Sequence, residues 1–240
     1  MLKNKIVFVS GGSGYLGSAI CERCAYYGAT VYFSYYKNKD QAETMMERIE
    51  GSKGIKINLK DVRDIEDKIE QLHKEIEGVD ILVNNAGVSQ IMPFPMLEED
   101  DVDFMMDLNI KGTIFLTKSI TRRMIKLKHG SIVNIGSIAG HRMLDVPVHY
   151  AVTKAAMAGF TYSLAAQMKR YGIRVNSVVP GLLEDGVSRG VPKELLEDYL
   201  NHCSVGRPGT GKEVAEAVCF LASDRASYIN GQNIFVDGGL

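Results

Sequence analysis

The chain has 240 residues, of which 45% are hydrophobic and 24% charged, and this size and balance suit one compact α/β domain with a substantial core. The 28 Lys and Arg residues nearly match the 29 Asp and Glu residues. The resulting formal net charge of -1 excludes a global basic field that would attract nucleic acid or an anionic membrane. We find neither a signal-peptide pattern nor a run of about 18 apolar residues, so we expect a cytoplasmic protein that does not span a membrane.

Seven short runs rich in β-branched residues alternate with helical stretches along the chain. Several of these runs are apolar at nearly every position, which is typical of parallel strands buried on both faces. The expected strands are residues 6–9, 30–33, 55–59, 81–83, 131–135, 174–179 and 233–236. The expected helices are residues 18–26, 39–49, 65–76, 102–126, 151–171 and 212–221. The order predicts a Rossmann-type, doubly wound α/β fold: seven parallel strands with helices on both faces, in a single domain over residues 1–240.

Four cysteines, at positions 21, 24, 203 and 219, are too few and too scattered for a disulfide framework. Cys21 and Cys24 have the spacing of a redox or zinc motif. They fall inside the first expected helix, however, and not at its N-terminus, where a thiol pKa is lowered. We therefore expect buried cysteines and no metal site.

A glycine-rich segment joins the first expected strand to the first helix. Residues 10–17 read Ser-Gly-Gly-Ser-Gly-Tyr-Leu-Gly. In this position glycines let backbone N–H groups and a helix N-terminus approach a pyrophosphate, because no Cβ blocks the way. A plain tight turn is the alternative, but the placement between strand and helix favours a dinucleotide site.

The end of the second strand bears on the choice of cofactor. No acid stands about twenty residues beyond the glycines, where one would bind the ribose 2′-hydroxyl of NAD. Lys37 and Lys39 can instead neutralise a 2′-phosphate, so NADP(H) is favoured over NAD(H), the alternative being ordinary surface lysines. Asp61 and Val62, just past the third strand, are expected at the adenine ring, or else form a solvated loop.

Tyr150 and Lys154 stand at i and i+4 and so share one face of a helix. A phenol with an ordinary pKa of about 10 exchanges protons poorly at neutral pH, and an adjacent cation favours its phenolate form. Tyr150 can then protonate a carbonyl oxygen that receives hydride, or deprotonate an alcohol. Ser137, at the end of the fifth strand, can donate a hydrogen bond to the same oxygen. An exposed helical pair is the alternative interpretation of Tyr150 and Lys154.

Six landmarks, in order, resemble the short-chain dehydrogenase/reductase family, and the likeness runs from residue 5 to residue 239. They are residues 10–17, Asp61-Val62, Asn84-Asn85-Ala86-Gly87, Asn109, Ser137 thirteen residues before Tyr150-x-x-x-Lys154, and Pro180-Gly181. The resemblance implies an NAD(P)-dependent oxidoreductase acting on CH–OH groups. It implies that Lys154 binds the nicotinamide ribose, and that Asn109 holds a water linking Lys154 to solvent as a proton relay.

The resemblance also implies a set of residues for each role. The catalytic set is Asn109, Ser137, Tyr150 and Lys154. The cofactor-binding set is Gly11, Ser13, Gly14, Tyr15, Leu16, Gly17, Tyr35, Lys37, Asp61, Val62, Asn85, Ala86, Gly87, Tyr150, Lys154, Pro180, Gly181 and Leu183.

Two departures from the family pattern bear on the cofactor site. Tyr15 stands where most short members have the middle glycine, and Gly14 stands where a basic residue often grips the 2′-phosphate. We therefore expect a reshaped phosphate contact. Asp185 replaces a threonine that commonly contacts the cofactor. Because it would repel the pyrophosphate, we expect it to point away or the loop to close differently.

The substrate is left open between classes. Residues 207–209 and 228–239 resemble the 3-oxoacyl-[acyl-carrier-protein] reductases of fatty acid biosynthesis, which reduce β-keto thioesters. The alternatives are a dehydrogenase or reductase of a small alcohol, sugar, steroid or secondary metabolite, and a non-enzymatic dinucleotide sensor or scaffold. The complete catalytic set argues against the last. For a small substrate the expected pocket residues are His141, Arg142, Met143, His149 and a substrate loop at residues 181–208.

An acidic carrier protein as partner would need a basic landing area near the site mouth. The candidates are Arg122, Arg123, Lys126, Lys128, Lys169 and Arg170. Solvated helix ends are the alternative, because Lys and Arg favour helix C-termini for dipole reasons. The family resemblance also implies a homotetramer, or a homodimer, built on residues 102–126 and 151–171.

Overall fold

The computed structural model describes residues 1–186 and 191–240, and within them the strands form one seven-stranded sheet in the order β3-β2-β1-β4-β5-β6-β7. Every neighbouring pair is parallel. The strands are β1 (Ile6–Val9), β2 (Thr30–Tyr35), β3 (Lys53–Lys56), β4 (Ile81–Asn84), β5 (Gly130–Ile135), β6 (Ile173–Pro180) and β7 (Asn233–Val236). The predicted doubly wound α/β fold is confirmed.

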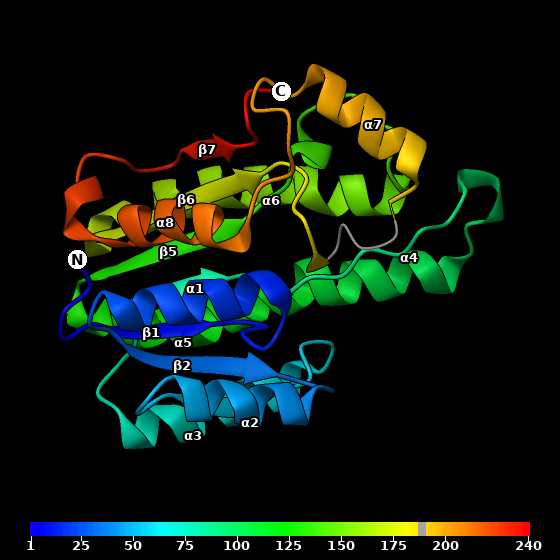
Figure 1. Ribbon diagram of the computed structural model, residues 1–240. Coiled ribbons are helices and arrows are strands. Elements are labelled where there is room, and N and C mark those ends of the chain that lie inside the picture. Colours follow the sequence, from blue (N-terminus) through cyan, green and yellow to red (C-terminus); the bar gives the residue numbers. More distant parts are fainter. Residues whose placement is uncertain (187–190) are drawn as a thin grey trace.

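Helices cover both faces of the sheet. One face carries α1 (Tyr15–Tyr26), α2 (Lys39–Arg48) and α8 (Gly211–Ala222), and Figure 1 shows α1 and α8 lying side by side over the strands. The other face carries α3 (Val62–Glu75), α5 (Thr113–Leu127) and α6 (Val148–Met168). Short 3₁₀ turns are η1 (Phe94–Met96), η3 (Ile138–Gly140), η4 (Lys169–Tyr171) and η6 (Asp224–Ala226).

Strand β1 shows why a continuous apolar run marks a central parallel strand. Val7 and Val9 pack into the core under α1 and α8, whereas Phe8 between them packs into the core under α3 and α5. All three side chains are fully buried. Because successive residues of a strand point to opposite faces, a strand with helices on both sides needs apolar residues at every position.

The strand order reverses direction between β1 and β4, since the chain builds outward through β2 and β3 and then returns to start β4 beside β1. In open α/β sheets such a switch point leaves a crevice at the carboxyl ends of the strands. Figure 1 shows α7 (Lys193–His202) and α4 (Glu99–Met106) at the end toward which the strands point, with the C-terminus beside α7.

Three expected elements differ in the structure. The helix expected over 102–126 is divided into α4, a π-helical turn η2 (Asp107–Gly112) and α5. The substrate loop expected over 181–208 contains the helix α7, and its residues 187–190 lie outside the described part of the chain. Strand β3 begins and ends earlier than the expected 55–59. The apolar side chains of Ile57 and Leu59 are buried although they follow the strand, which explains why the apolar run suggested a later end.

The predicted burial of the cysteines is confirmed. Cys21, Cys24 and Cys219 are fully buried free thiols, and the Sγ atoms of Cys24 and Cys219 lie 3.7 Å apart between α1 and α8. Burial raises the pKa of the Cys21 thiol, which keeps it protonated and unreactive. In the described part of the chain, no three His, Cys, Asp or Glu side chains gather as a metal site would require. No helix there has the length and apolarity needed to cross a membrane.

Candidate active site

A cleft of about 1800 Å³ opens at the carboxyl ends of the strands, at the switch point. Its walls come from the β1–α1 turn, the ends of β4 and β5, the start of α6 and the segment after β6. Pockets for one small ligand measure about 300–1,000 Å³. The cleft therefore has room for a dinucleotide and a substrate together.

The glycine turn is fastened to the end of β4. The Ser10 hydroxyl oxygen accepts hydrogen bonds from the backbone N–H groups of Asn85 (3.0 Å) and Ala86 (2.9 Å). The Asn85 side chain in return donates to the carbonyl oxygens of Ser10 (2.9 Å) and Gly11 (3.1 Å). A Cβ on Gly17 would lie 2.2 Å from the Gly11 oxygen, so this approach requires glycine. The predicted glycine turn and residues 85–87 thus meet at one wall of the cleft.

The first turn of α1 is open toward the cleft. Its N-cap is Gly14, and no side chain caps the helix end. Because the first N–H groups of a helix have no partner inside it, this end can bind an anion. All six predicted residues of this segment line the cleft: Gly11, Ser13, Gly14, Tyr15, Leu16 and Gly17. The arrangement fits the pyrophosphate of a nicotinamide dinucleotide.

The end of β2 forms the neighbouring wall. Ser34 is buried there, and its hydroxyl oxygen accepts a 3.1 Å hydrogen bond from the Gly11 N–H. Tyr35 and Lys37 line the cleft, as predicted. Lys39 does not line it, and its Nζ atom lies 3.3 Å from Glu43 Oε1 on α2. Of the two candidate lysines, only Lys37 is placed to meet a 2′-phosphate.

The structure places Asp61 and Val62 just after the part of the cleft wall that follows β3. Neither residue lines the cleft, whose wall at this point consists of residues 57–60, among them Asn58 and Leu59. The Asp61 carboxylate caps α3 instead, accepting hydrogen bonds from the N–H groups of Arg63 (2.9 Å) and Asp64 (3.3 Å). An aspartate just before a helix satisfies orphan N–H groups in this way, which explains its position without a cofactor.

Ser137, Tyr150 and Lys154 all line the cleft. The start of α6 supplies Tyr150 and Lys154, and the end of β5 leads into Ser137. Lys154 Nζ lies 5.8 Å from the centroid of the Tyr150 ring, as their i and i+4 spacing predicts. The structure therefore brings the predicted proton-transfer group together.

Burial sets the protonation of this group. It raises the pKa of the Tyr150 phenol, and a hydrogen bond with Ser137 lowers that pKa in part. It lowers the pKa of the Lys154 ammonium to about 8. That the Lys154 cation favours the phenolate form of Tyr150 stays a prediction. The phenol stays protonated, which is the form that can donate a proton to a carbonyl oxygen.

Asn109 lies on the π-helical turn η2 and is buried. Its Oδ1 atom accepts a hydrogen bond from the Val88 N–H (3.0 Å), and its Nδ2 atom donates to the Val88 carbonyl (3.0 Å) and to Thr153 Oγ1 (3.1 Å). A Cβ on Gly87 would lie 3.4 Å from Asn109 Oδ1 and 3.7 Å from Lys154 Nζ. Asn109 therefore lies beside Lys154, and its side chain fixes the segment after β4.

The segment after β6 borders the same end of the cleft. Pro180, Gly181 and Leu183 line it, as predicted. Asp185 lines it too, although we expected this residue to point away. The Asp185 carboxylate accepts a 2.6 Å hydrogen bond from the Gly186 N–H.

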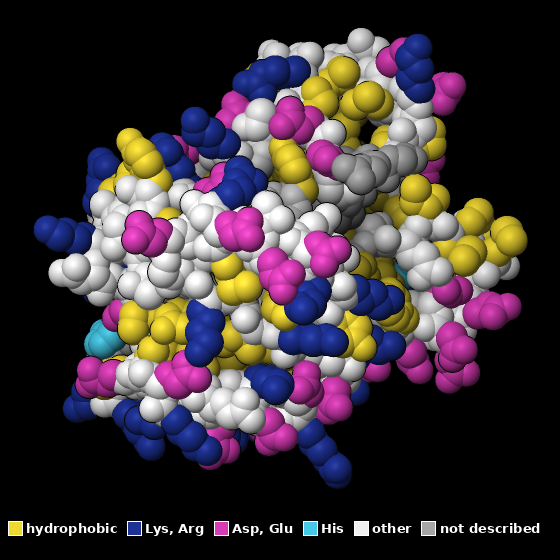
Figure 2. Space-filling view, turned by 60° about the horizontal axis from the view of Figure 1, so that its bottom comes forward, with side chains coloured by type: hydrophobic (Ala, Val, Ile, Leu, Met, Phe, Trp, Pro, Cys, Tyr) yellow, Lys and Arg dark blue, Asp and Glu magenta, His cyan; other side chains and the backbone are white. Residues whose placement is uncertain are grey.

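The outer half of the cleft is lined mostly by apolar residues, together with Ser89, Arg142, Asp145, Asp198 and His202. Figure 2 shows hydrophobic side chains gathered on the lobe that projects at the right of the molecule, with acidic side chains next to them. Ile91 and Phe94, before and within η1, are 67% and 66% exposed while they also line the cleft. Further apolar lining residues are Met92, Pro93, Phe104, Leu108, Leu144, Val146, Val148, Val191 and Leu195. This half of the cleft suits an apolar substrate.

Two of the four expected pocket residues line the cleft, namely Arg142 and Met143. His141 stacks edge-on against Phe235, with the ring centroids 5.2 Å apart, and is not part of the lining. His149 is buried, and neither ring nitrogen has a hydrogen-bond partner among the described residues. His149 is thus packed in the interior and is not part of the cleft lining.

Helix α7 supplies a lining residue, Tyr199, that we expected only as part of the substrate loop at residues 181–208. The Tyr199 hydroxyl accepts a hydrogen bond from the Leu182 N–H (3.1 Å) and donates to the Asp237 carbonyl (3.1 Å). It thereby fastens α7 to the segments after β6 and β7. The signal was present, since Leu195, Tyr199 and His202 follow Pro192 at helical spacing and all three line the cleft.

The basic residues proposed as a landing area do not flank the cleft of their own chain. Arg122, Arg123, Lys126 and Lys128 lie at the C-terminal end of α5, and Lys169 and Arg170 lie in η4, just after α6. Tyr150 stands at the opposite end of α6, roughly 28 Å away at about 1.5 Å per helical residue. The expectation that they surround the mouth is therefore wrong for a single chain.

The chain is similar in sequence to a known protein family and to enzymes of known name. Residues 13–240 match the family described as Enoyl-(Acyl carrier protein) reductase. The 3-oxoacyl-[acyl-carrier-protein] reductase of Aquifex aeolicus (strain VF5) is 35% identical over 244 residues, which cover 100% of this chain and 98% of that protein. The enzyme of the same name from Escherichia coli (strain K12) is 34% identical, with 99% and 98% covered.

Two solved structures show the same likeness. A gluconate 5-dehydrogenase from Burkholderia cenocepacia J2315, in complex with NADP and tartrate, has a TM-score of 0.93 at 27% identity, covering 100% of this chain and 96% of that one. A putative betaketoacyl-ACP reductase has a TM-score of 0.88 at 31% identity, covering 100% and 98%. The similarity therefore spans the whole chain in both sequence and fold.

Proposed function

Because the chain belongs to the short-chain dehydrogenase/reductase family of NAD(P)-dependent oxidoreductases, we propose that it uses NADPH to reduce the ketone of a 3-oxoacyl thioester carried by acyl carrier protein. The observation that carries this proposal is the protonated Tyr150 phenol beside Ser137, at the base of an apolar cleft. Reduction needs a proton donor at the carbonyl oxygen, and these two hydroxyls supply the donor and a second hydrogen bond.

In the proposed reaction the bound nicotinamide supplies the hydride. Tyr150 gives its phenolic proton to the carbonyl oxygen, and Ser137 donates a hydrogen bond to that oxygen. Lys154 binds the nicotinamide ribose, and its buried ammonium stabilises the phenolate that Tyr150 becomes. Asn109, beside Lys154, holds the water through which the proton is replaced from solvent.

Lys37 supports NADPH as the cofactor. It is the charged side chain at the end of β2 that lines the cleft, and residues 34–38 include no carboxylate that would repel a 2′-phosphate. The matching gluconate 5-dehydrogenase was solved with NADP. Gly14 stands where a basic residue of the family often binds the 2′-phosphate. Lys37 is therefore the residue that we propose to recognise this phosphate.

The apolar outer half of the cleft supports an acyl chain as part of the substrate. A polyol or sugar acid would leave its hydroxyl groups facing Ile91, Phe94 and Leu144 without partners, which costs free energy. A small polar substrate, as the similarity to a gluconate 5-dehydrogenase suggests, is the alternative. Arg142 favours it, since this positively charged residue is part of the cleft lining.

We also propose a homotetramer built on α5 and α6. Exposed apolar side chains lie on these helices, where a partner would cover them: Ile114, Val152 and Tyr162. Light scattering on the purified protein tests this directly. A monomer at micromolar concentration would contradict it.

The proposed reaction is tested by following NADPH consumption with matched substrates. The panel consists of short and long 3-oxoacyl thioesters on acyl carrier protein and on coenzyme A, together with a keto sugar acid. We expect the highest kcat/KM with a 3-oxoacyl thioester. A higher value with the sugar acid would refute the acyl substrate, and no turnover with any ketone despite cofactor binding would refute the reductase.

A further inference from the structure

Tyr15, which occupies the place of a family glycine, connects three segments around the cofactor end of the cleft. It is the first residue of α1. Its hydroxyl donates a 2.7 Å hydrogen bond to Glu184 Oε1, in the segment after β6, and accepts a 2.9 Å hydrogen bond from the Gly211 N–H. Gly211 is the first residue of α8. One side chain thus joins the glycine turn to two segments far along the chain.

The surroundings of the ring are shaped to admit it. A Cβ on Gly211 would lie 3.3 Å from Tyr15 Cε1, and a Cβ on Gly186 would lie 3.3 Å from Tyr15 Cβ. Gly186 also has a φ of +83°, which side chains rarely adopt. Glycines on two sides therefore leave the space that the Tyr15 ring fills.

The two segments that Tyr15 joins are themselves linked. Leu183 and Gly209 form a parallel β-bridge, in which the Gly209 N–H donates to the Leu182 carbonyl (2.9 Å) and the Glu184 N–H donates to the Gly209 carbonyl (3.0 Å). Helix α7 lies in the chain between these two segments. The bridge and Tyr15 thus hold together the two segments that flank α7 in the chain, which we call the base of α7.

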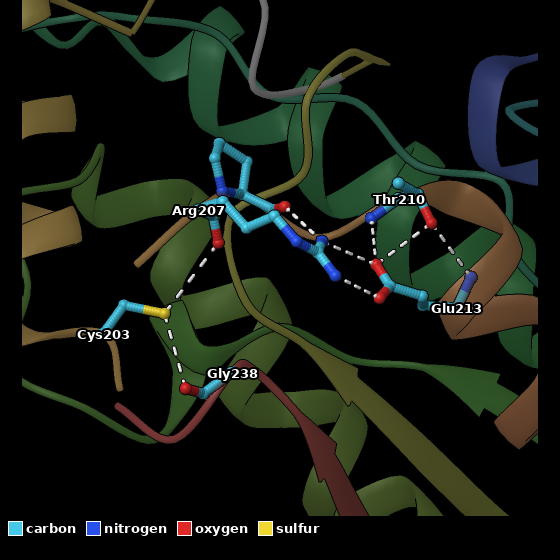
Figure 3. Close-up of polar contacts among 6 residues, drawn as sticks. Cys203, Arg207, Thr210, Glu213 and Gly238 are labelled. Carbon is cyan, nitrogen blue, oxygen red and sulfur yellow. Dashed lines mark hydrogen bonds and ion pairs between the residues drawn. The ribbon is translucent and has the colours of Figure 1, made fainter. Parts of the chain in front are cut away.

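The same base is reinforced at the start of α8, as Figure 3 shows. The Arg207 guanidinium pairs with the Glu213 carboxylate at 2.7 and 3.1 Å. Glu213 Oε2 accepts hydrogen bonds from the Thr210 N–H (2.8 Å) and hydroxyl (3.0 Å), while Thr210 Oγ1 accepts from the Glu213 N–H (3.2 Å). This capping box fixes Thr210, and Gly211 follows it directly.

We propose that Tyr15 is a positioning residue for the cofactor, because it holds Glu184 and Gly211 against the glycine turn at the pyrophosphate end. The Glu184 carboxylate is the acceptor that holds the Tyr15 hydroxyl in this position. Tyr15 thereby replaces the flexibility of a glycine with a hydrogen-bonded connection. The proposal rests on the nicotinamide cofactor of the family and is independent of the substrate proposed above.

The test is the affinity for NADPH, measured by its fluorescence on binding without substrate. Tyr15→Phe removes only the hydroxyl, and we expect the Kd to rise about 5- to 20-fold, the range expected for a lost hydrogen bond to a charged group. Glu184→Ala should reproduce this rise, and the double variant should add little to either. Glu184→Gln, which keeps an acceptor, should restore affinity to within about twofold. Tyr26→Phe, an exposed tyrosine on the same helix, is the matched control.

A second measurement uses the protein without cofactor. In Tyr15→Phe, amide hydrogen exchange should accelerate at Gly211 and residues 182–186 and stay unchanged in α2. An unchanged Kd, or a lower kcat with an unchanged Kd, would overturn the proposal. If Tyr15→Phe does not fold, the NADPH Kd and the amide hydrogen exchange of Glu184→Ala test the proposal in the same way. A failure of the proposed substrate would leave these binding data intact.

Discussion

Lys154 Nζ donates a 3.0 Å hydrogen bond to the Ile135 carbonyl oxygen, at the last residue of β5. This bond holds a buried ammonium at the base of the cleft, where no carboxylate is hydrogen-bonded to it among the described residues. A buried charge without a carboxylate partner is costly, and the cost shows in the pKa of Lys154, which burial lowers from 10.5 to about 8. The fold thus keeps a charge that stability alone would not favour.

Replacing this charge should stabilise the protein. The lowered pKa corresponds to on the order of 3 kcal/mol, and losing the hydrogen bond to Ile135 offsets about 1 kcal/mol of it. Lys154→Met should therefore raise the free energy of unfolding by roughly 2 kcal/mol at pH 7 while abolishing activity. Urea denaturation of the cofactor-free protein measures the change. Lys126→Met, at an exposed lysine, is the control and should leave stability nearly unchanged.

The pH dependence of the same variant follows from the sign of the shift. Below pH 8 both the folded and the unfolded chain carry the Lys154 proton, so the cost of burying the charge is fully present. Between pH 8 and 10.5 the unfolded chain binds a proton that the folded chain has lost, so wild-type stability gains relative to the variant as pH rises. The excess free energy of unfolding of Lys154→Met over the wild type should therefore shrink between pH 8 and 10.5. A constant difference would show that burial does not depress this pKa.

Tyr150→Phe should lower kcat by on the order of 10³-fold, the usual scale of a lost general acid. The Kd of NADPH, measured by fluorescence, should change far less, because only the phenolic oxygen is removed. Burial raises the pKa of Tyr150, so the wild-type rate of reduction should show no loss of the phenol proton near neutral pH and should fall only in the alkaline range. A rate that fell between pH 6 and 7 at constant cofactor saturation, below the pKa of about 8 of Lys154, would contradict this assignment.

Much of this site could be predicted because its parts are local in sequence. The spacing of Tyr150 and Lys154 is fixed by one helix, and the glycine turn by one strand–helix junction. The role of Asp61 at the adenine ring stays a prediction, since an aspartate before Val62 and Arg63 also marks a helix N-cap. The sequence around it gave equal grounds for either role.

Other features depend on contacts that no local pattern contains. The break at Asn109 arises where its side chain binds Val88 and Thr153, on two other segments. Tyr199 depends likewise on Leu182 and Asp237, which the fold brings to α7 from either side. The Tyr15 connection spans 169 residues to Glu184. Such long-range partners appear only once the sheet order is known.

The preference for NADPH should depend on Lys37 and not on Lys39. Lys37→Ala removes the cation that lines the cleft and should raise the KM of NADPH about tenfold, with little effect on NADH, which has no 2′-phosphate. Lys39→Ala is the matched control, because this lysine pairs with Glu43 outside the cleft. Steady-state kinetics with NADPH and with NADH measure how much each variant changes the KM of each cofactor relative to the wild type. Equal losses with NADPH and NADH in Lys37→Ala would assign the residue a structural role instead.

The apolar lobe at the mouth should set the preference for acyl chain length. Phe94 is exposed in the free protein and lines the cleft, so an acyl chain long enough to reach it would bury its ring. Phe94→Ala should lower kcat/KM about 5- to 20-fold for long 3-oxoacyl thioesters and change it less than about twofold for the shortest one. Phe220→Ala, an exposed ring on α8 that does not line the cleft, is the control. Equal losses at every chain length would show that Phe94 does not contact the acyl chain.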